Sequence, residues 1–368
     1  MTRKSVYLYV SHRFDFVFYA RLVEALNSSS PELKFTLVLP YTFMQDDKIK
    51  SFVTTYFANY LLAPIYLSSS PDFFRSVWSL VCLRGWFNKF IDLQSLLVST
   101  DKSSRFSRFF LKRSRHVLLL QQPEIAIDSR FQFDLFRTLS DFVKSYFIGS
   151  RFALFFTLKS SDRTIAALKL LGPRNSQHFQ RLVMSHAQHT QLPPLSLSSS
   201  FYVPKFVFFG SRFLSWPYFN DKFLSNRLKV LASFFNFLAS TYAGNDFIYL
   251  KHPLEQGDEF DFVRKSFDGK IDLVTSYFSS EHFLFSNRDV FMTCSIGSTS
   301  SASSYSMGFN TKVLYESLFF ASDVKAIYSA ILADLPLSSH VRTNADFSIQ
   351  SSLNVSNQDN LLLHSFLS

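Results

Sequence analysis

Cysteine is nearly absent from this chain, and so are the glycine motifs that many phosphate-binding proteins carry. Among its 368 residues there are only two cysteines, Cys82 and Cys294, both within apolar runs. Two cysteines are too few for a disulfide framework, which favours a protein of a reducing compartment. The nine glycines form neither a Gly-x-x-x-x-Gly-Lys-Ser/Thr loop nor a Gly-x-Gly-x-x-Gly turn, so neither motif is available for phosphate binding.

Long apolar runs, a secretory leader and metal-ligand spacing are lacking as well. No window approaches the roughly 18 uncharged apolar residues that a membrane-spanning helix needs, and residues 1–5 lead into a strand rather than into a leader. His186 and His189 have no acidic or cysteine partner at the spacing of a zinc site. We therefore expect a cytoplasmic protein with no metal and no other cofactor.

Phenylalanine and basic residues are abundant instead. The chain has 46 Phe, 47% hydrophobic residues and 18% charged residues, a composition that can bury a core in each half. Its 38 basic and 28 acidic residues give a net charge of +10, which favours anionic partners. The basic residues are scattered and the aromatic residues follow core periodicity, so we expect no nucleic-acid partner.

One basic and aromatic segment spans residues 105–116, where arginine and lysine alternate with phenylalanine. Such a segment is typical of a surface that lies on an anionic membrane. An ordinary helix with a solvated basic face and phenylalanines in the core fits the same pattern. A peripheral contact with the inner membrane is therefore one of two interpretations.

The order of apolar runs predicts two parallel sheets. In the first half a strand at 5–10, a polar loop, a helix at 16–26 and a strand at 34–39 form a βαβ unit. The pattern restarts in the second half with a strand at 205–209, a helix at about 221–240 and a strand at 247–250. The predicted fold class is α/β, with two Rossmann-like domains.

A proline- and serine-rich stretch at residues 191–200 is the best linker in the sequence. The chain is also too long for one typical domain. We therefore predict an N-terminal domain over 1–195 that binds the acceptor, a C-terminal domain over 203–345 that binds the nucleotide, and a tail over 346–368. Two such domains would face each other across a cleft that closes on the substrate.

Polar side chains gather where the strands of the second half end, which is the edge where open α/β sheets bind ligands. Hydroxyls and N–H groups at a helix start suit a phosphate, and a histidine nearby suits charge stabilisation or proton transfer. The predicted ligand residues are Gly210, Ser211, Arg212, Lys251, His252, Pro253, Ser298, Thr299, Ser300, Ser301 and Glu316. Each also has a structural interpretation: a capped strand end for His252, a serine-rich background for the serine run and a surface carboxylate for Glu316.

Three carboxylates of the first half are candidate catalytic groups on position alone. Asp15 lies in the loop between the first strand and the first helix, and Glu124 and Asp128 follow a predicted strand at 117–120. An inverting enzyme needs a base for the acceptor hydroxyl, whereas a retaining enzyme can use a carboxylate as nucleophile. The sequence leaves both mechanisms open.

The pair His252-Pro253, followed by the run Ser298-Thr299-Ser300-Ser301, resembles the nucleotide-binding motifs of bacterial GT-B glycosyltransferases. The similar enzymes are CMP-sugar-dependent sialyltransferases and Kdo transferases of capsule and lipopolysaccharide synthesis, and the resemblance covers roughly residues 203–318. It implies transfer of a sialic-acid-like or Kdo sugar from a CMP donor to a cell-surface glycan or glycolipid, with His252 as a catalytic residue.

The resemblance is incomplete in the first half. Many of those sialyltransferases carry an Asp/Glu-Asp/Glu-Gly tripeptide that supplies the base, whereas here Asp46-Asp47 is followed by Lys48. The base and the donor sugar are therefore not carried over. Two alternatives stay open: a CDP-polyol phosphate transferase of the teichoic-acid type, which pairs a His-Pro with a later serine motif, and a non-catalytic protein that binds anionic glycans or nucleic acid.

Overall fold

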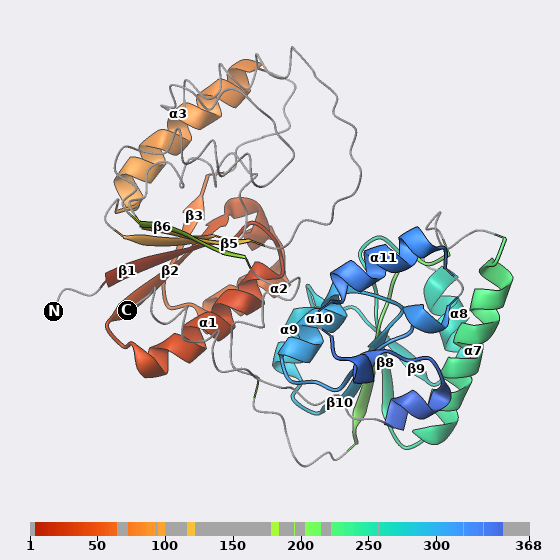
Figure 1. Cartoon of the computed structure of the whole chain (residues 1–368). Coiled ribbons are helices and arrows are strands. Elements are labelled where there is room, and N and C mark those ends of the chain that lie inside the picture. The colour runs from red at the N-terminus through yellow and green to blue at the C-terminus, as the bar shows by residue number, and fades with distance from the viewer. Residues whose placement is uncertain are drawn as a thin grey trace. The chain divides into compact units, whose positions relative to one another are not determined.

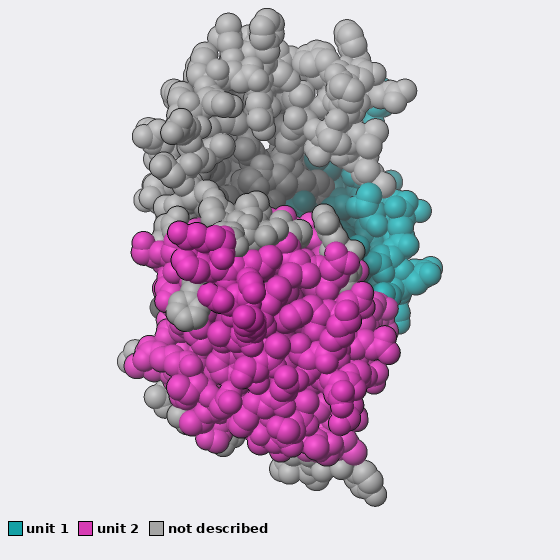
Figure 2. Space-filling view, turned by 90° about the vertical axis from the view of Figure 1, so that its right-hand side faces the viewer, with its two compact units in different colours: residues 1–183 teal, residues 184–368 magenta. Residues whose placement is uncertain are grey.

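The computed structural model divides the chain into two compact units, Met1–Val183 and Met184–Ser368 (Figures 1 and 2). The structure describes residues 4–64, 73–92, 95–99, 116–121, 178–183, 195, 203–214, 222–255, 258–318, 320–333 and 335–348. No helix in these ranges is long and apolar enough to cross a membrane. The basic segment 105–115, the predicted linker except residue 195, and residues 349–368 lie outside the described residues.

The first unit is built on a parallel six-stranded sheet in the order β3-β2-β1-β4-β5-β6. The strands are β1 (Lys4–Tyr9), β2 (Leu33–Pro40), β3 (Tyr60–Ala63), β4 (Leu96–Ser99), β5 (His116–Gln121) and β6 (His178–Val183). Helices α1 (Asp15–Ser29) and α2 (Asp47–Tyr56) cover one face of the sheet and α3 (Phe73–Phe90) covers the other, and a short 3-10 helix η1 (Tyr41–Gln45) precedes α2 (Figure 1). The strand order reverses between β1 and β4, as in a Rossmann sheet.

The second unit repeats this plan with a parallel five-stranded sheet in the order β11-β10-β7-β8-β9. Its strands are β7 (Lys205–Phe209), β8 (Asp246–Leu250), β9 (Ile271–Val274), β10 (Val290–Ser295) and β11 (Thr311–Val313). Figure 1 shows helices α7 (Leu224–Thr241) and α8 (Asp258–Ser266) on one side of the sheet, and α9 (Ser280–Ser286) and α10 (Thr299–Ser306) on the other. The chain continues through η3 (Tyr315–Ser317), α11 (Ser322–Ile331), η4 (Leu337–Ser339) and η5 (Asn344–Ser348).

Phenylalanine fills the core of the second unit. Phe206 on β7 lies in register between Met292 of β10 and Phe247 of β8, and all three side chains are buried. Phe208 packs edge-on against Phe235 of α7, with ring centroids 5.0 Å apart. Burying a side chain of this size contributes about 1.5–3 kcal/mol. Much of the chain's large phenylalanine content is therefore core.

The predicted fold class is confirmed, because both halves form parallel α/β sheets with Rossmann order. The βαβ unit that opens each half lies where the sequence predicts it, with ends shifted by a few residues. One strand prediction needs correction. β11 ends at Val313, and Glu316 lies in the 3-10 helix that follows rather than at a strand end.

Candidate functional site

Several loops of the second unit leave their strands at one edge of the sheet. Because the strands are parallel, their carboxyl ends lie on the same side. The strand order reverses between β7 and β10, which is where such sheets bind ligands. Only β7 separates β8 from β10, so the loops after these two strands begin about 10 Å apart. The loops after β7, β8 and β10, together with the first two residues of α10, carry the predicted ligand residues Gly210, Ser211, Arg212, Lys251, His252, Pro253, Ser298, Thr299 and Ser300.

His252 lies in a turn whose hydrogen bonds fix its imidazole. Its backbone N–H donates to Oε1 of Glu255 at 2.8 Å, and its carbonyl accepts the Glu255 N–H at 3.0 Å. The Leu254 N–H donates to Nδ1 of His252 at 3.1 Å. Since Nδ1 accepts this hydrogen bond, the neutral ring carries its own proton on Nε2. The turn therefore presents His252 as an Nε2–H donor.

The surroundings of His252 favour the neutral imidazole. Burial lowers its pKa, the positive charge of Arg212 lowers it further, and Glu259 of α8 acts in the opposite direction. His252 is half-buried, whereas Lys251 and Pro253 on either side are exposed. Near pH 7 the side chain is therefore a neutral donor that can stabilise negative charge on a departing phosphate.

A buried carboxylate, Glu255, closes this turn. Glu255 is 7% exposed and the neighbouring Tyr249 is fully buried. Burial raises the pKa of Glu255 to about 7, although the hydrogen bond from His252 and the interaction with the Tyr249 hydroxyl oppose the rise. Burial and the adjacent Glu255 also raise the pKa of Tyr249, so its hydroxyl keeps its proton. Oε2 of Glu255 and the Tyr249 hydroxyl make no hydrogen bond of regular geometry.

Gly210 brings the loop after β7 against these two side chains. A methyl group on its Cα would collide with Oε1 of Glu255 and would lie 2.7 Å from the Tyr249 hydroxyl. Glycine is therefore the one residue that allows this approach without a shift of the neighbours. Next to it, the Ser211 hydroxyl is buried without a hydrogen-bond partner, and Arg212 is exposed.

The raised pKa of Glu255 predicts that the protein loses stability as pH rises from about 4.5 to about 7. In this range the folded protein holds a proton on Glu255 that the unfolded chain has released, so raising the pH favours unfolding. The variant Glu255→Gln lacks this titration. Its melting temperature relative to wild type is therefore expected to rise between pH 5 and pH 8, as followed by circular dichroism. A difference that stays constant over this range would contradict the assignment.

The run from Ser298 to Ser301 begins α10 as predicted. Ser298 caps the helix, and its Oγ accepts the Ser300 N–H at 3.2 Å. The Ser298 N–H donates to Oγ of Ser295 at 3.1 Å, and the Ser301 N–H donates to the Ser298 carbonyl at 2.9 Å. Because these backbone donors are already engaged, an anion here would interact with hydroxyls and with the positive end of the helix dipole.

The hydroxyls of this run have two different environments. Ser301 is fully buried, and its hydroxyl lies 2.7 Å from that of Ser295, so it holds α10 against β10 rather than facing the edge. The Ser300 hydroxyl lies 2.7 Å from that of Ser280, which donates to Glu281 at 3.2 Å. The first three residues of the run are partly or fully exposed, so they stay the predicted phosphate ligands. Ser301 is positioned for packing.

Glu316 is engaged by the segment that follows it. Its Oε2 accepts the Arg342 Nε–H at 2.6 Å, and its Oε1 lies 2.9 Å from Nδ1 of His340. The carboxylate is partly buried. Both oxygens therefore have protein partners, and contact with a ribose diol would have to compete with them.

The first unit gives Asp15 a structural role. Its carboxylate is fully buried, and Oδ2 accepts the Ser11 N–H at 2.8 Å, the His12 N–H at 2.8 Å and the Ser11 hydroxyl at 3.1 Å. It therefore stabilises the loop between β1 and α1, which explains the polar pattern there without catalysis. Glu124 and Asp128 lie outside the described residues.

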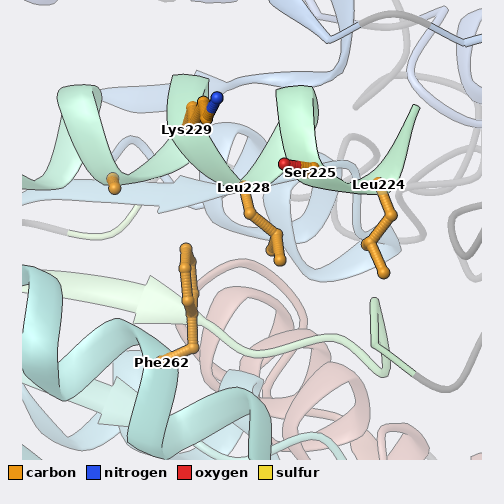
Figure 3. A pocket seen from close by; sticks show the side chains of 6 residues that line it. Leu224, Ser225, Leu228, Lys229 and Phe262 are labelled. Atoms are coloured by element: carbon orange, nitrogen blue, oxygen red, sulfur yellow. The ribbon is translucent and has the colours of Figure 1, made fainter. Parts of the chain in front are cut away.

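A pocket of about 400 Å³ lies between α7 and α8 and includes none of the predicted ligand residues. Figure 3 shows Leu228 of α7 and Phe262 of α8 approaching each other across it. Its lining is Leu224, Ser225, Leu228, Lys229, Ala232 and Phe262. With mostly apolar side chains, it is not suited to a phosphate. Among the described residues, no group of three or more His, Cys, Asp or Glu is placed to hold a metal ion.

No protein-family model and no curated protein sequence matches the chain. Solved structures do match over its whole length. The chain is similar to a crystal structure of a UDP-N-acetylglucosamine 2-epimerase, with a TM-score of 0.51 at 10% identity over 100% of this chain and 98% of that one. The fold is of the GT-B type, with two Rossmann-like units.

Two further solved structures have lower TM-scores. A putative UDP-N-acetylglucosamine 2-epimerase from Listeria monocytogenes has a TM-score of 0.49 at 9% identity, over 100% of this chain and 96% of that one. The GT-B domain of a sialyltransferase from Photobacterium damselae has a TM-score of 0.43 at 11% identity, over 90% and 96%. At these identities the likeness concerns the fold alone.

The sequence pattern does not mark several buried residues of the second unit that carry polar groups, among them Glu255, Tyr249 and Arg227. Glu255 and Tyr249 meet only because the loop after β8 folds back on its strand. The spacing of His252 and Glu255, three residues apart, is the one local signal for this turn. Arg227 is fully buried on α7, with its guanidinium 4.7 Å from the centroid of the Phe320 ring, and nothing in the local pattern distinguishes it from a surface arginine.

Proposed function

We propose that the protein is a glycosyltransferase that takes a sialic-acid-like or Kdo sugar from a CMP-activated donor and transfers it to a cell-surface glycan or glycolipid. The observation that carries the proposal is the turn at His252. It presents a neutral Nε2–H donor at the edge of the sheet beside the strand-order reversal. The GT-B type fold is compatible with this chemistry and does not select it.

The geometry supports different roles for the residues that would surround a nucleotide phosphate. His252 would donate to the phosphate as the sugar leaves, and the exposed Lys251 and Arg212 would supply positive charge. Thr299 and Ser300 at the start of α10 would add hydroxyls from the other side of β7. Positioning the two reactants in this way is worth far more than any single hydrogen bond.

The acceptor must lose a proton during transfer, and the second unit has no assigned base for that step. Asp15 is used by its own loop. Glu124 and Asp128 therefore stay the candidate bases, on the position in the sequence that first suggested them. A retaining mechanism could use a carboxylate as nucleophile, and the acceptor hydroxyl would still have to give its proton to a base.

A ligand screen tests the proposal. Melting temperatures of the full chain would be measured with CMP, CDP, UDP and a short oligonucleotide, because a ligand that binds only the folded state raises the melting temperature. We expect stabilisation by CMP above that by UDP, and a smaller shift in His252→Ala. UDP belongs in the screen because a UDP-N-acetylglucosamine 2-epimerase shares the fold.

Each of the other outcomes would contradict the proposal and favour a different function. Preference for CDP would favour transfer of a polyol phosphate, and preference for UDP would favour a UDP-sugar enzyme. Stabilisation by the oligonucleotide alone would favour a non-catalytic binding protein. A CMP shift would then be followed by incubation with CMP-sialic acid and CMP-Kdo and measurement of the released CMP.

A further inference from the structure

The turn from His252 to Glu255 is closed by a reciprocal pair of hydrogen bonds. The Glu255 side chain accepts the His252 N–H through Oε1 at 2.8 Å, and the Glu255 N–H donates to the His252 carbonyl at 3.0 Å. Within the turn, the Leu254 N–H reaches Nδ1 of His252 at 3.1 Å. The side-chain bond and the imidazole bond therefore share one short piece of backbone, and a change in one alters the geometry of the other.

The Glu255 carboxylate is held on several sides. Tyr249 of β8 lies beside it with a protonated hydroxyl, and the backbone at Gly210 leaves it no room to move toward β7. The charged groups that act on it are Glu259 of α8 and Lys251 at the end of β8. His252 itself also faces Arg212 in the loop after β7.

We propose that Glu255 is a positioning residue that, in its ionised form, holds the His252 turn so that the imidazole presents Nε2–H at the edge of the sheet. The inference rests on the proposed function only for what His252 then contacts. The positioning itself is a property of the ligand-free protein.

The physical reason lies in the two protonation states of the carboxyl group. An ionised carboxylate accepts the His252 N–H in a charge-assisted hydrogen bond, which is stronger than one to a neutral acid. A protonated Glu255 is a weaker acceptor and adds a donor to a cluster that already contains the Tyr249 hydroxyl. With a pKa of about 7, both forms are populated near neutral pH. The hydrogen bond that holds the turn is therefore stronger above that pH, although the buried charge makes the folded protein as a whole less stable there.

The test is nuclear magnetic resonance of the imidazole nitrogens of His252 in the ligand-free full chain as pH is varied. In wild type we expect the Nε2–H tautomer and a chemical-shift inflection near pH 7, in addition to the inflection of His252 itself at lower pH. Glu255→Gln should keep the tautomer, because the amide oxygen still accepts the His252 N–H, and should lose the neutral inflection. Persistence of that inflection in Glu255→Gln would overturn the proposal.

Two further variants sharpen the test. Glu255→Ala should lose the strict tautomer preference, and an unchanged tautomer would overturn the proposal; if this variant does not fold, the Glu255→Gln result decides alone. Tyr249→Phe removes an interaction that lowers the pKa of Glu255, so the neutral inflection should move to higher pH. An inflection that stays in place would show that it does not report this carboxyl group.

A CMP titration separates this proposal from the proposed function. If CMP binds, its affinity in wild type should fall as pH drops through 7, and in Glu255→Gln the affinity should be independent of this titration. If the His252 nitrogen spectra behave as expected but CMP does not bind, the positioning role of Glu255 is supported and the CMP-donor function is excluded. If CMP binds tightly but the His252 spectra of Glu255→Gln are the same as those of wild type, the CMP-donor function is supported and the positioning role of Glu255 is excluded.

Discussion

Replacement of His252 by alanine is expected to lower turnover of a CMP-activated donor by about 10²–10⁴-fold, the range for losing a group that handles charge or a proton in the transition state. The imidazole is held by its turn with Nε2–H available and its pKa lowered by burial. Removing it takes away the donor that would meet the developing phosphate charge. The measurement is CMP release under saturating donor and acceptor.

Stability measurements make this result interpretable. The alanine variant loses one hydrogen bond, from the Leu254 N–H, which costs about 1 kcal/mol, so the fold should persist. Leu273→Ala, at an exposed position of β9, serves as a control with expected wild-type turnover. Near-normal release of CMP by His252→Ala would exclude His252 from the mechanism.

The sequence predicts the two sheets because several of their strands, such as β7 and β10, are buried on both faces. Four of the five residues in the run 205–209 are buried, and such an apolar run is typical of a covered parallel strand. The same reasoning does not order the short apolar runs between residues 48 and 100. β3 is a short edge strand with an exposed first residue, Tyr60, and α3 exposes Trp78, so apolar residues there do not report burial.

For the candidate site, the sequence predicts where the residues lie but not the environment of each side chain. The position of His252 and of the α10 start follows from strand ends, which the apolar pattern marks well. The environment of each side chain does not follow, because it depends on contacts between loops. Ser301 carries a hydroxyl like its neighbours Thr299 and Ser300, and Asp15 follows the exposed His12 and Arg13. Both Ser301 and Asp15 are nevertheless buried and hydrogen-bonded internally. No periodicity in the sequence distinguishes these cases.

Replacement of Gly210 by alanine is expected to destabilise the second unit by about 1–3 kcal/mol, the usual cost of overpacking a filled site. The new methyl group would collide with Oε1 of Glu255 and lie 2.7 Å from the hydroxyl and 2.9 Å from the ring of Tyr249. The carboxylate is the more mobile neighbour, but moving it breaks its hydrogen bond to the His252 N–H. Chemical denaturation gives the loss, and the His252 nitrogen shifts report the turn.

Two comparisons show whether the collision with Glu255 causes the loss of stability in Gly210→Ala: a glycine elsewhere in the unit, and a background that lacks the Glu255 side chain. Gly244→Ala places its methyl group in open space and should leave the free energy of unfolding within about 0.5 kcal/mol of wild type. In a Glu255→Ala background, Gly210→Ala should cost less than it does alone, since the first colliding atom is gone and residues in contact are not additive. If Gly210→Ala lowers the free energy of unfolding equally in both backgrounds, the Glu255 carboxylate moves away from the methyl group at no cost. The close fit of Gly210 would then not be what holds Glu255 against His252.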